Sequence, residues 1–331
     1  MSKQKAINTQ PIRNIGVLTS GGDAPGMNAV IRAVVRGGIF HGFRVFGIER
    51  GYHGMWRGNI VELNSRSVSE KLQRGGTFLM TARSKTFNTS EGVDKAIAMA
   101  KVFNLDAVVV IGGDGTFRGA RDLAAKGFPV IAIPGTIDND IACTEYTIGY
   151  DTAMNTAMQA IDRLRDTASS HERCSVIEVM GRNAGYLALN VAVATGAEVV
   201  MIPEVETNIQ SDVIKVLLEG RNRGKKHFIV VVAEGTGNTM EITRTIEKVA
   251  GIEARATILG HLQRGGSPTL RDRQMGSIMG LRAVECLHQG RLNRVIAYRQ
   301  GNILDLDIEE ALSMTKTISA EDLERAHILA L

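Results

Sequence analysis

The sequence is poor in cysteine, aromatic residues and long apolar runs, and each shortage excludes a class of protein. Its three cysteines show neither metal-ligand spacing nor a disulfide framework, which predicts a cytoplasmic protein. Aromatic residues make up only 5%, and the net charge of +4 is too small to indicate nucleic-acid binding. No apolar run approaches the roughly 20 residues that span a bilayer, so we expect no membrane partner. Residues 1–14 lack the apolar core of a secretory signal and are expected to form a short extension.

The chain of 331 residues does contain a repeated alternation of short β-rich runs and longer helical patterns. Apolar runs of about four to six residues bounded by glycine are typical of strands buried on both faces. Their alternation with helices, of which 26–42 and 152–168 are the clearest, predicts parallel sheets with right-handed crossovers. The expected strands are 14–20, 44–50, 106–113, 128–135, 175–181, 198–203, 227–235 and 294–300.

Turns with unusual chemistry follow many of these strands. They read SGGDAPG, GGDGT, PGTIDND, MGRNAG and AEGTG. Because ligands of open parallel sheets bind at the carboxyl ends of strands, these turns are candidate binding loops. They fall on either side of about residue 150, which indicates two α/β domains facing a cleft.

Two of the turns are rich in glycine. The stretch TSGGDAPGMN (19–28) precedes a helix whose dipole would favour a phosphate, but it matches neither GxxxxGK[ST] nor GxGxxG, and a plain tight turn explains it equally well. In IGGDGTFRG (111–119) the glycines allow a close backbone approach, and Asp114 is placed to hold a magnesium ion. Thr116 could cap the following helix, which is the structural alternative.

The stretch VIAIPGTIDNDI (130–141) ends an apolar strand with two carboxylates. Acids are costly there unless they are solvated, paired or metal-bound. Phosphoryl transfer to a hydroxyl requires a carboxylate to accept the proton and a metal to neutralise the phosphates. In an extended segment Thr136, Asp138 and Asp140 would share one face, with one acid as base and the other orienting it or supporting the metal. A network of Asx turns is the alternative.

Basic residues supply candidate phosphate clamps. Four arginines stand in polar, turn-like contexts, namely Arg173, Arg182, Arg255 and Arg264. Guanidinium groups bind phosphate with two parallel hydrogen bonds, although any one of these arginines alone is more often a solvated charge. Arg32 and Arg36 share a helix face and, with 221–227, form a candidate second anion site, for which a solvated surface is the commoner explanation.

Together these segments resemble the bacterial ATP-dependent 6-phosphofructokinases, a glycolytic family, from about Asn14 to about Ala311. The resemblance is carried, in order, by IGVLTSGGDAPGMNA, RGGTFL, VVVIGGDGT, PGTIDNDI, AIDRLRDT, EVMGR and LGHLQRGGSP. It implies transfer of the γ-phosphoryl group of MgATP to the 1-hydroxyl of fructose 6-phosphate in a homotetramer. It also implies two three-layer α/β domains with mainly parallel sheets that face an active-site cleft. The larger, ATP-binding domain would comprise 1–149 and 263–313, and the smaller, fructose 6-phosphate-binding domain 150–262 and 314–331.

The resemblance further implies roles for individual residues. Asp138 would be the catalytic base, with Thr136, Asp140 and Arg182 beside the transferring group and Asp114 associated with Mg²⁺. The implied ATP-binding residues are Gly22, Arg83, Ser84, Gly113, Asp114, Gly115 and Thr116. The implied sugar-phosphate residues are Thr136, Ile137, Asp138, Arg173, Met180, Gly181, Arg182, Glu234, Arg255, His261, Leu262, Gln263 and Arg264. Of these, Arg173 and Arg255 would reach the site of a neighbouring subunit.

Donor choice and regulation are implied in the same way. Pyrophosphate-using relatives carry an acid at the position of Gly115 and a lysine at that of Gly135, so ATP is the implied donor. A separate site for the effectors ADP or phosphoenolpyruvate would use Arg32, Arg36, Arg165, Gly196, Ala197, Glu198, Arg223, Lys225, Lys226 and His227. Asn59 stands where an effector-binding arginine is common, which would weaken that site unless Arg57 replaces it.

Three alternatives stay open at this stage. The first is a pyrophosphate-dependent phosphotransferase, which the two glycines argue against. The second is a non-enzymatic sugar-phosphate sensor, which the presence of Asp138 argues against. The third is a kinase for diacylglycerol, NAD or tagatose 6-phosphate. The full sugar-phosphate set disfavours diacylglycerol and NAD, whereas tagatose 6-phosphate stays open as a side substrate.

Overall fold

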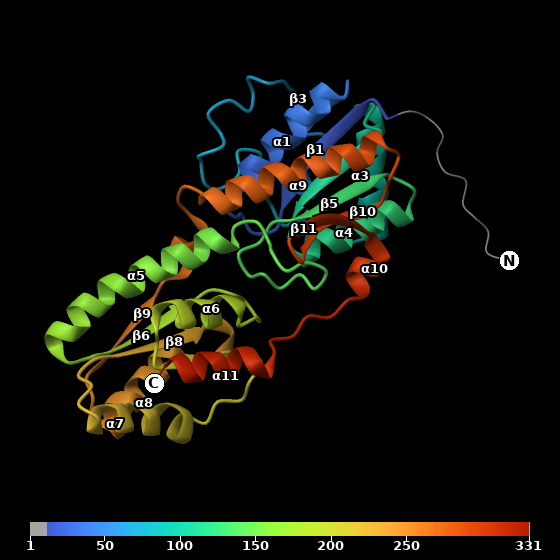
Figure 1. Ribbon diagram of the computed structural model, residues 1–331. Coiled ribbons are helices and arrows are strands. Elements are labelled where there is room, and N and C mark those ends of the chain that lie inside the picture. The colour runs from blue at the N-terminus through green and yellow to red at the C-terminus, as the bar shows by residue number, and fades with distance from the viewer. Residues whose placement is uncertain (1–11, 331) are drawn as a thin grey trace.

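The computed structural model describes residues 12–330, which form two twisted sheets with helices on both faces (Figure 1). The seven-stranded sheet has the order β11-β10-β5-β4-β1-β2-β3 and the four-stranded sheet the order β7-β8-β6-β9. The first sheet comprises β1 (Asn14–Ser20), β2 (Arg44–Ile48), β3 (Ile60–Leu63), β4 (Ala107–Gly112), β5 (Val130–Pro134), β10 (Arg294–Arg299) and β11 (Asn302–Asp307). The second comprises β6 (Cys174–Val179), β7 (Val199–Met201), β8 (Phe228–Ala233) and β9 (Ala254–Ile258).

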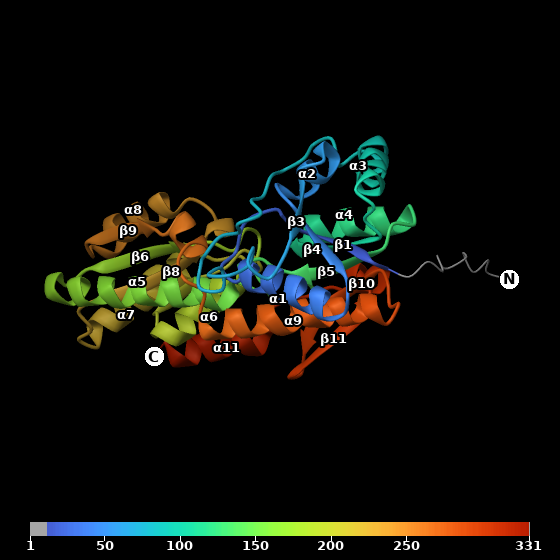
Figure 2. The same ribbon diagram turned by 90° about the horizontal axis from the view of Figure 1, so that it is seen from above.

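The helices complete three layers around each sheet (Figure 2). Helices α1 (Met27–Phe40) and α9 (Leu270–His288) cover one face of the first sheet. The other face is covered by α2 (Gly51–Arg57), α3 (Ser90–Val102), α4 (Asp114–Ala125) and α10 (Ile308–Ser313). In the second sheet, α5 (Tyr150–His171) and α6 (Tyr186–Thr195) face α7 (Lys215–Asn222) and α8 (Thr239–Ala250), while α11 (Ala320–Leu329) packs on α6. No helix within 12–330 has the length and apolar character needed to cross a membrane.

The central strands are apolar on both sides because both sides meet a helix layer. Val109 of β4 joins the cluster under α1 and α9, whereas its neighbours Val108 and Val110 join the cluster under α3 and α4. All six residues of β4 and all six of β8 are buried. The predicted α/β fold with mainly parallel sheets is confirmed, as are the two expected helices.

Three strands escaped the sequence analysis, namely β3, β9 and β11. Each lies at an edge of its sheet and is only partly buried, so its sequence lacks the continuous apolar run that marks the central strands. Two of them depart from the expected parallel pairing, since β3 is antiparallel to β2 and β11 is antiparallel to β10.

A buried carboxylate fixes the start of α5. Asp272, in the first turn of α9, is 0% exposed and accepts hydrogen bonds from Tyr146 Oη (2.5 Å), Gly149 N (2.7 Å), Thr152 N (2.8 Å) and Thr152 Oγ1 (2.5 Å). Helix α5 has no side-chain cap of its own, so Asp272 satisfies amides that the end of a helix leaves open. Helix α5, which leads the chain from the first sheet to the second, is therefore anchored to α9, the helix that leads the chain back to the first sheet.

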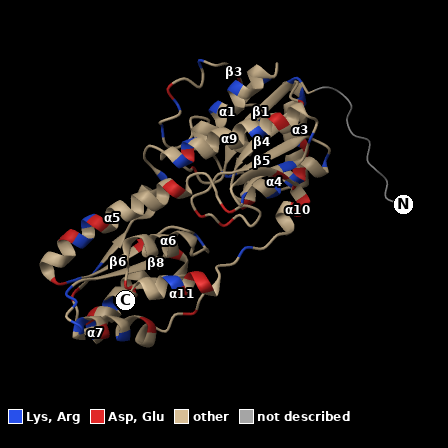
Figure 3. Ribbon diagram, viewed as in Figure 1, with Lys and Arg blue, Asp and Glu red and all other residues tan. Residues whose placement is uncertain are grey.

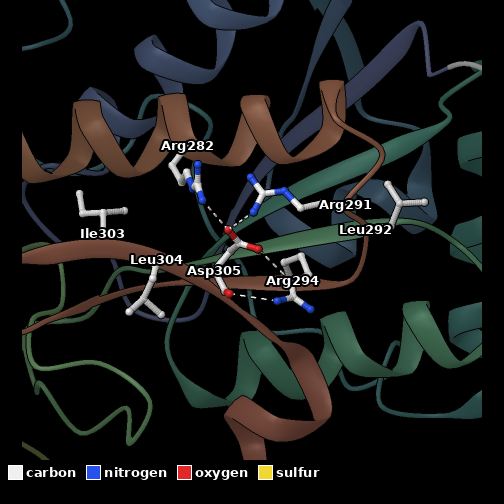
Figure 4. A pocket seen from close by; sticks show the side chains of 7 residues that line it. All are labelled: Arg282, Arg291, Leu292, Arg294, Ile303, Leu304 and Asp305. Atoms are coloured by element: carbon white, nitrogen blue, oxygen red, sulfur yellow. Dashed lines mark hydrogen bonds and ion pairs between the residues drawn. The ribbon is translucent and has the colours of Figure 1, made fainter.

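A second buried carboxylate, Asp305 of β11, gathers three arginines at the edge of the first sheet (Figure 4). Its side chain is 4% exposed and pairs with Arg282 Nη2 at 2.8 Å, Arg291 Nη1 at 2.5 Å and Arg294 Nε at 3.1 Å. Burial alone would raise the pKa of Asp305, but the guanidinium groups, Arg291 first, outweigh it and lower the pKa. Glu285 and Asp307 lie at 3.6 and 4.0 Å from Arg282 and Arg294, so the charges of this corner balance.

We expect Asp305→Asn to lower the free energy of unfolding by about 1.5–3 kcal/mol, the range for hydrogen bonds to charged groups, because it leaves guanidinium groups crowded without their shared partner. Since the pKa of Asp305 is lowered on folding, its contribution is present above the pKa of the unfolded carboxyl and is lost as the pH falls through the folded value. Urea unfolding of both proteins across acidic pH measures this.

Glu62→Gln is the matched control for this experiment. Glu62 pairs with Arg44 at 2.7 Å, but both side chains are more than half exposed, so Glu62→Gln should lower the free energy of unfolding much less than Asp305→Asn does. Equal effects of the two substitutions would contradict a special role for the Asp305 corner.

Candidate active site

The turn after β1 lies against an arginine from the other sheet. Arg264 ends the short helix Gly260–Arg264 that follows β9, and its Nη1 donates to the backbone oxygen of Asp23 at 3.0 Å. A Cβ atom at Gly22 would lie 2.7 Å from the same nitrogen. The absence of a side chain at Gly22 therefore allows Arg264 to contact the turn after β1. The turn after β1 in the first sheet and the turn after β9 in the second sheet are thus in contact.

The second glycine turn opens α4. Gly113 is the N-cap and offers no side-chain cap, so the first amides of the helix stay available to an anion. Asp114 pairs with Arg118 at 2.8 Å, and a Cβ atom at Gly115 would meet no atom within 4 Å. Thr116 does not cap the helix, contrary to one expectation. It lies inside the first turn, where its hydroxyl donates to the backbone oxygen of Ser20 at 3.0 Å.

The turn after β5 presents a buried acid, Asp138, one of whose carboxylate oxygens has no partner in the described chain. The expected extended segment is wrong, because Asn139 has φ 51° and Thr136 Oγ1 accepts a hydrogen bond from the amide of Asp138 at 3.2 Å. This bend leaves the Asp138 side chain 7% exposed, and its Oδ1 is buried with no hydrogen-bond partner in the described chain. The Asx-turn alternative fails for Asp138, since its carboxylate does not bond to its own backbone.

Asp138 and Asp140 both have raised pKa values. Burial, followed by repulsion from Asp140, raises the pKa of Asp138, whereas the nearby charge of Arg264 and the hydrogen bond with Thr136 oppose the rise. Burial also raises the pKa of Asp140, and the charge of Asp114 adds to it. Three carboxylates thus influence one another at the carboxyl ends of β4 and β5. Within residues 12–330 no three His, Cys, Asp or Glu side chains are arranged to hold a metal ion unaided.

The carboxyl ends of β6, β8 and β9 are tied together beside these acids. Glu234 follows β8, and its Oε1 accepts hydrogen bonds from the amides of Gly181 (3.3 Å) and Arg182 (2.6 Å). Gln263 is fully buried, and its Oε1 accepts from the amide of Met180 at 2.8 Å. The charge of Glu234 also reaches Asp138, where it raises the pKa. The backbone of 180–182 is therefore fixed next to the unpartnered acid.

The remaining predicted residues lie at the rim or beneath it. Arg83, Arg182, His261 and Leu262 are exposed, and Ile137 is fully buried. An open hollow of about 670 Å³ is lined by Thr156, Leu259, His261, Leu262, Gly265 and Gly266. The hydroxyl of Ser84, next to the exposed Arg83, accepts a hydrogen bond from the amide of Phe87 at 3.2 Å.

Arg173 and Arg255 lie at the opposite end of the second sheet. Arg173 precedes β6, and Arg255 of β9 is paired in register with Ser175. Both contact Glu253, Arg173 Nε at 2.9 Å and Arg255 Nη2 at 2.7 Å. At about 3.3 Å per residue, the strand separates Arg173 from Met180 by roughly 20 Å. Within a single chain, Arg173 and Arg255 therefore lie far from Asp138 and Asp140.

Most of the predicted effector residues gather at that same end, where basic segments, drawn in blue, lie beside α7 (Figure 3). Lys225 pairs with the buried Glu198, and Arg165 donates to the backbone oxygen of Thr195. Lys226 pairs with Glu172 at 2.8 Å. The others are neighbours in the chain, namely Gly196 at the end of α6, Ala197, Arg223 at the end of α7, and His227 before β8.

Arg32 and Arg36 lie elsewhere, on α1. Burial, and then the charge of Arg36, lowers the pKa of Arg32. In the described part of the chain, no hydrogen bond or ion pair joins either of them to the group around Lys225.

Lys316 is a residue that the sequence analysis missed. It lies between α10 and α11, and its ammonium group donates to the backbone oxygens of Asn139 (2.6 Å) and Thr144 (3.1 Å). It belongs to the final twenty residues, in which no motif could be recognised, and nothing in the sequence MTKTIS distinguishes it from a solvated lysine.

Comparison with known proteins shows the family. Residues 14–287 match the phosphofructokinase family. The ATP-dependent 6-phosphofructokinase of Clostridium botulinum strain Hall is 52% identical over 319 residues, which cover 96% of this chain and 100% of that protein. That of Clostridium tetani is 54% identical over 303 residues, covering 92% and 95%. The T-state crystal structure of Pichia pastoris phosphofructokinase superposes with a TM-score of 0.88 and 32% identity. It matches 100% of this chain, which spans only 41% of the yeast chain. The chain belongs to the phosphofructokinase family.

Proposed function

We propose that this protein transfers the γ-phosphoryl group of ATP to the 1-hydroxyl of fructose 6-phosphate, giving fructose 1,6-bisphosphate, the committed step of glycolysis. The observation that carries the proposal is the buried, unpartnered carboxylate oxygen of Asp138 among three acids. The names of the clostridial relatives at 52–54% identity support the choice of donor and acceptor. The buried, unpaired state of the three cysteines is compatible with a cytoplasmic location.

Asp138 acts as the general base in this proposal. A base is most effective when its pKa lies near the working pH, and burial moves the pKa of Asp138 in that direction. Arg264 limits the rise, which favours the ionised form that can accept a proton. Thr136 and Arg182 would contact the transferring phosphoryl group, and Asp140 would orient the base.

The nucleotide would lie over the turns after β1 and β4. The open amides at the start of α4 suit its phosphates, together with Gly22 and the loop of Arg83 and Ser84. Mg²⁺, when bound, neutralises the phosphates. Asp114 fits such an ion, because its carboxylate is a hard oxygen ligand close enough to raise the pKa of Asp140, and Mg²⁺ is commonly held by one or two carboxylates plus substrate phosphates.

The sugar phosphate would lie against the fixed backbone of 180–182. Arg264 already bridges the two sheets and would neutralise charge near the reacting hydroxyl. The other contacts we propose are Ile137, Met180, Gly181, Arg182, Glu234, His261, Leu262 and Gln263. Arg173 and Arg255 would act from a neighbouring subunit of a homotetramer, which their position at the far end of the sheet supports.

We also propose the division into two domains and a separate effector site. Strands β10 and β11 belong to the first sheet and α11 packs on α6, which supports domains of 1–149 with 263–313 and of 150–262 with 314–331. The group around Lys225 and Glu198, joined by Arg32 and Arg36 of another subunit, would bind ADP or phosphoenolpyruvate as effectors.

Asp138→Asn is expected to lower kcat by at least 10²–10⁴-fold, the range for loss of a general base, while fructose 6-phosphate binding changes much less. The melting temperature should not fall, because a carboxylate whose pKa is raised on folding opposes stability at neutral pH. Steady-state kinetics with ATP and fructose 6-phosphate, beside a thermal melt, measure both. Asp122→Asn, an exposed surface change, is the control, and near-normal turnover of Asp138→Asn would refute the assignment.

For the donor, we expect turnover with ATP and none with pyrophosphate. Gly115→Asp should raise the KM for ATP by about tenfold or more, equivalent to about 1.4 kcal/mol of charge repulsion. A Cβ atom at this position meets no atom within 4 Å, so the fold should persist. Gly115→Ala is the control, since it adds the Cβ atom without the charge and should stabilise α4 by up to about 1 kcal/mol. Robust turnover of the unmutated protein with pyrophosphate alone would overturn the choice of donor.

Hybrid oligomers test the shared site. Arg173→Ala should raise the KM for fructose 6-phosphate by about 10–100-fold, from the loss of about 1.5–3 kcal/mol of charge-assisted hydrogen bonds. Mixing Arg173→Ala chains with Asp138→Asn chains should restore activity, since some sites then receive an intact residue from each chain. Arg264→Ala mixed with Asp138→Asn should not, because these two residues meet within one chain. Absence of recovery in verified Arg173 hybrids contradicts the shared site.

A further inference from the structure

Lys316 contacts the backbone on both sides of Asp140. The chain crosses after α10 to reach α11 beside the second sheet (Figure 1). Lys316 belongs to the segment 314–319 that makes this crossing. Its ammonium group donates to the backbone oxygen of Asn139 at 2.6 Å and to that of Thr144 at 3.1 Å, and lies 4.6 Å from the centre of the Tyr186 ring. A lysine has three N–H donors, and two carbonyl oxygens and a ring face can engage all of them.

The peptide that Lys316 holds is the one between the two acids. Asn139 has φ 51°, a left-handed conformation that residues other than glycine adopt infrequently. Its side chain donates a long hydrogen bond from Nδ2 to the backbone oxygen of Glu145 at 3.3 Å and lies near the Tyr150 hydroxyl. The shortest hydrogen bond recorded for residues 138–140 is therefore the one from Lys316. An unusual backbone conformation persists where its surroundings fix it, and here the fixing group comes from the end of the chain.

The positive charge of Lys316 also favours its position beside the acids. The acids of the site repel one another, and Lys316 lies behind them, where its charge opposes the burial that raises the pKa of Asp140. Burial in turn lowers the pKa of Lys316 to about 8, against the negative charges of Asp140 and Glu145 that face it. The Cys143 thiol also faces it, but burial raises the pKa of that thiol to about 11, so the thiol is uncharged at this pH. The ammonium form is thus kept at neutral pH by the loop that it binds.

We propose that Lys316 is a positioning residue that holds the turn between Asp138 and Asp140 in its reactive geometry and couples that turn to the carboxyl-terminal segment. This proposal rests on the proposed function of Asp138 as base. In this role the lysine acts through the peptide at Asn139, which it contacts directly. Loss of the contact lets that peptide turn and moves Asp138 relative to the hydroxyl.

The test compares Lys316→Met, which keeps length but removes charge and donors, with Lys316→Arg, which keeps both. Misplacement of a catalytic group by about 1 Å can cost up to about 10²-fold, so we expect kcat of Lys316→Met to fall about 10–100-fold. The KM for fructose 6-phosphate should change less than about threefold, because that side of the site stays intact. Lys316→Arg should recover most of the kcat. Lys95→Met, which removes an exposed lysine paired with Glu91, is the matched control.

Amide hydrogen exchange of residues 136–144, followed by mass spectrometry, needs no substrate. Exchange should quicken in Lys316→Met and stay unchanged in Lys95→Met. If the unmutated protein turned over no donor and acceptor, the proposed function would fail, and this measurement alone would decide on the contact made by Lys316. Unchanged exchange together with a kcat within twofold of the control overturns the proposal.

The pH profile decides the matter if Lys316→Met fails to fold. The unmutated enzyme should lose activity as the pH rises past about 8, where Lys316 gives up its proton. Lys316→Arg should hold its activity to higher pH, because a guanidinium does not deprotonate in this range. Identical alkaline limbs for the two proteins would overturn the proposal.

Discussion

The carboxylate of Asp272 holds the segment that follows the acid-rich turn after β5. Its four hydrogen bonds fix Tyr146, Gly149 and Thr152 against α9. The hydroxyl of Thr147, inside that segment, donates to the backbone oxygen of Thr136 at 2.6 Å, two residues before Asp138. The position of the proposed base thus depends on a chain of contacts that begins in a helix more than a hundred residues later in the sequence. Removing Asp272 would release the start of α5 and the turn after β5 together.

Asp138 and Asp272 show two uses of a buried acid. Burial is the first cause of the raised pKa of each. Around Asp272 four donors replace the hydrogen bonds that water would make, so this carboxylate has a structural role in linking α5 to α9. Oδ1 of Asp138 accepts no such bond from the described chain, and a buried polar atom without a partner lowers stability. Proteins retain such a group chiefly where it has a function, which agrees with the proposed role of Asp138.

The sequence predicted what depends on neighbours along the chain. The central strands, the two glycine turns and the acid-rich turn after β5 were recognisable because apolar runs, glycines and acids lie within a few residues of one another. The bend at Asn139 was not, since the sequence carried no sign that Lys316 would reach it from 177 residues away. Arg173 and Arg182 looked alike in the sequence, yet a strand places them at opposite ends of a sheet. Contacts between distant segments carry no local pattern, so they had to come from the structure.

The pairing of β5 with β10 has a consequence for how the chain is made. The amide of Val130 bonds to the side chain of Asn293, 163 residues further on, and β10 completes the edge of β5. On a ribosome, β5 would emerge at roughly 5–20 residues per second and wait about 8–30 seconds for its partner strand. During that time its apolar edge is unpaired and open to other chains. The second sheet, whose strands all lie within the intervening segment, can form meanwhile. Fast folding of that inserted segment would bring β10 back to β5 and shorten the period in which the nascent chain is prone to aggregate.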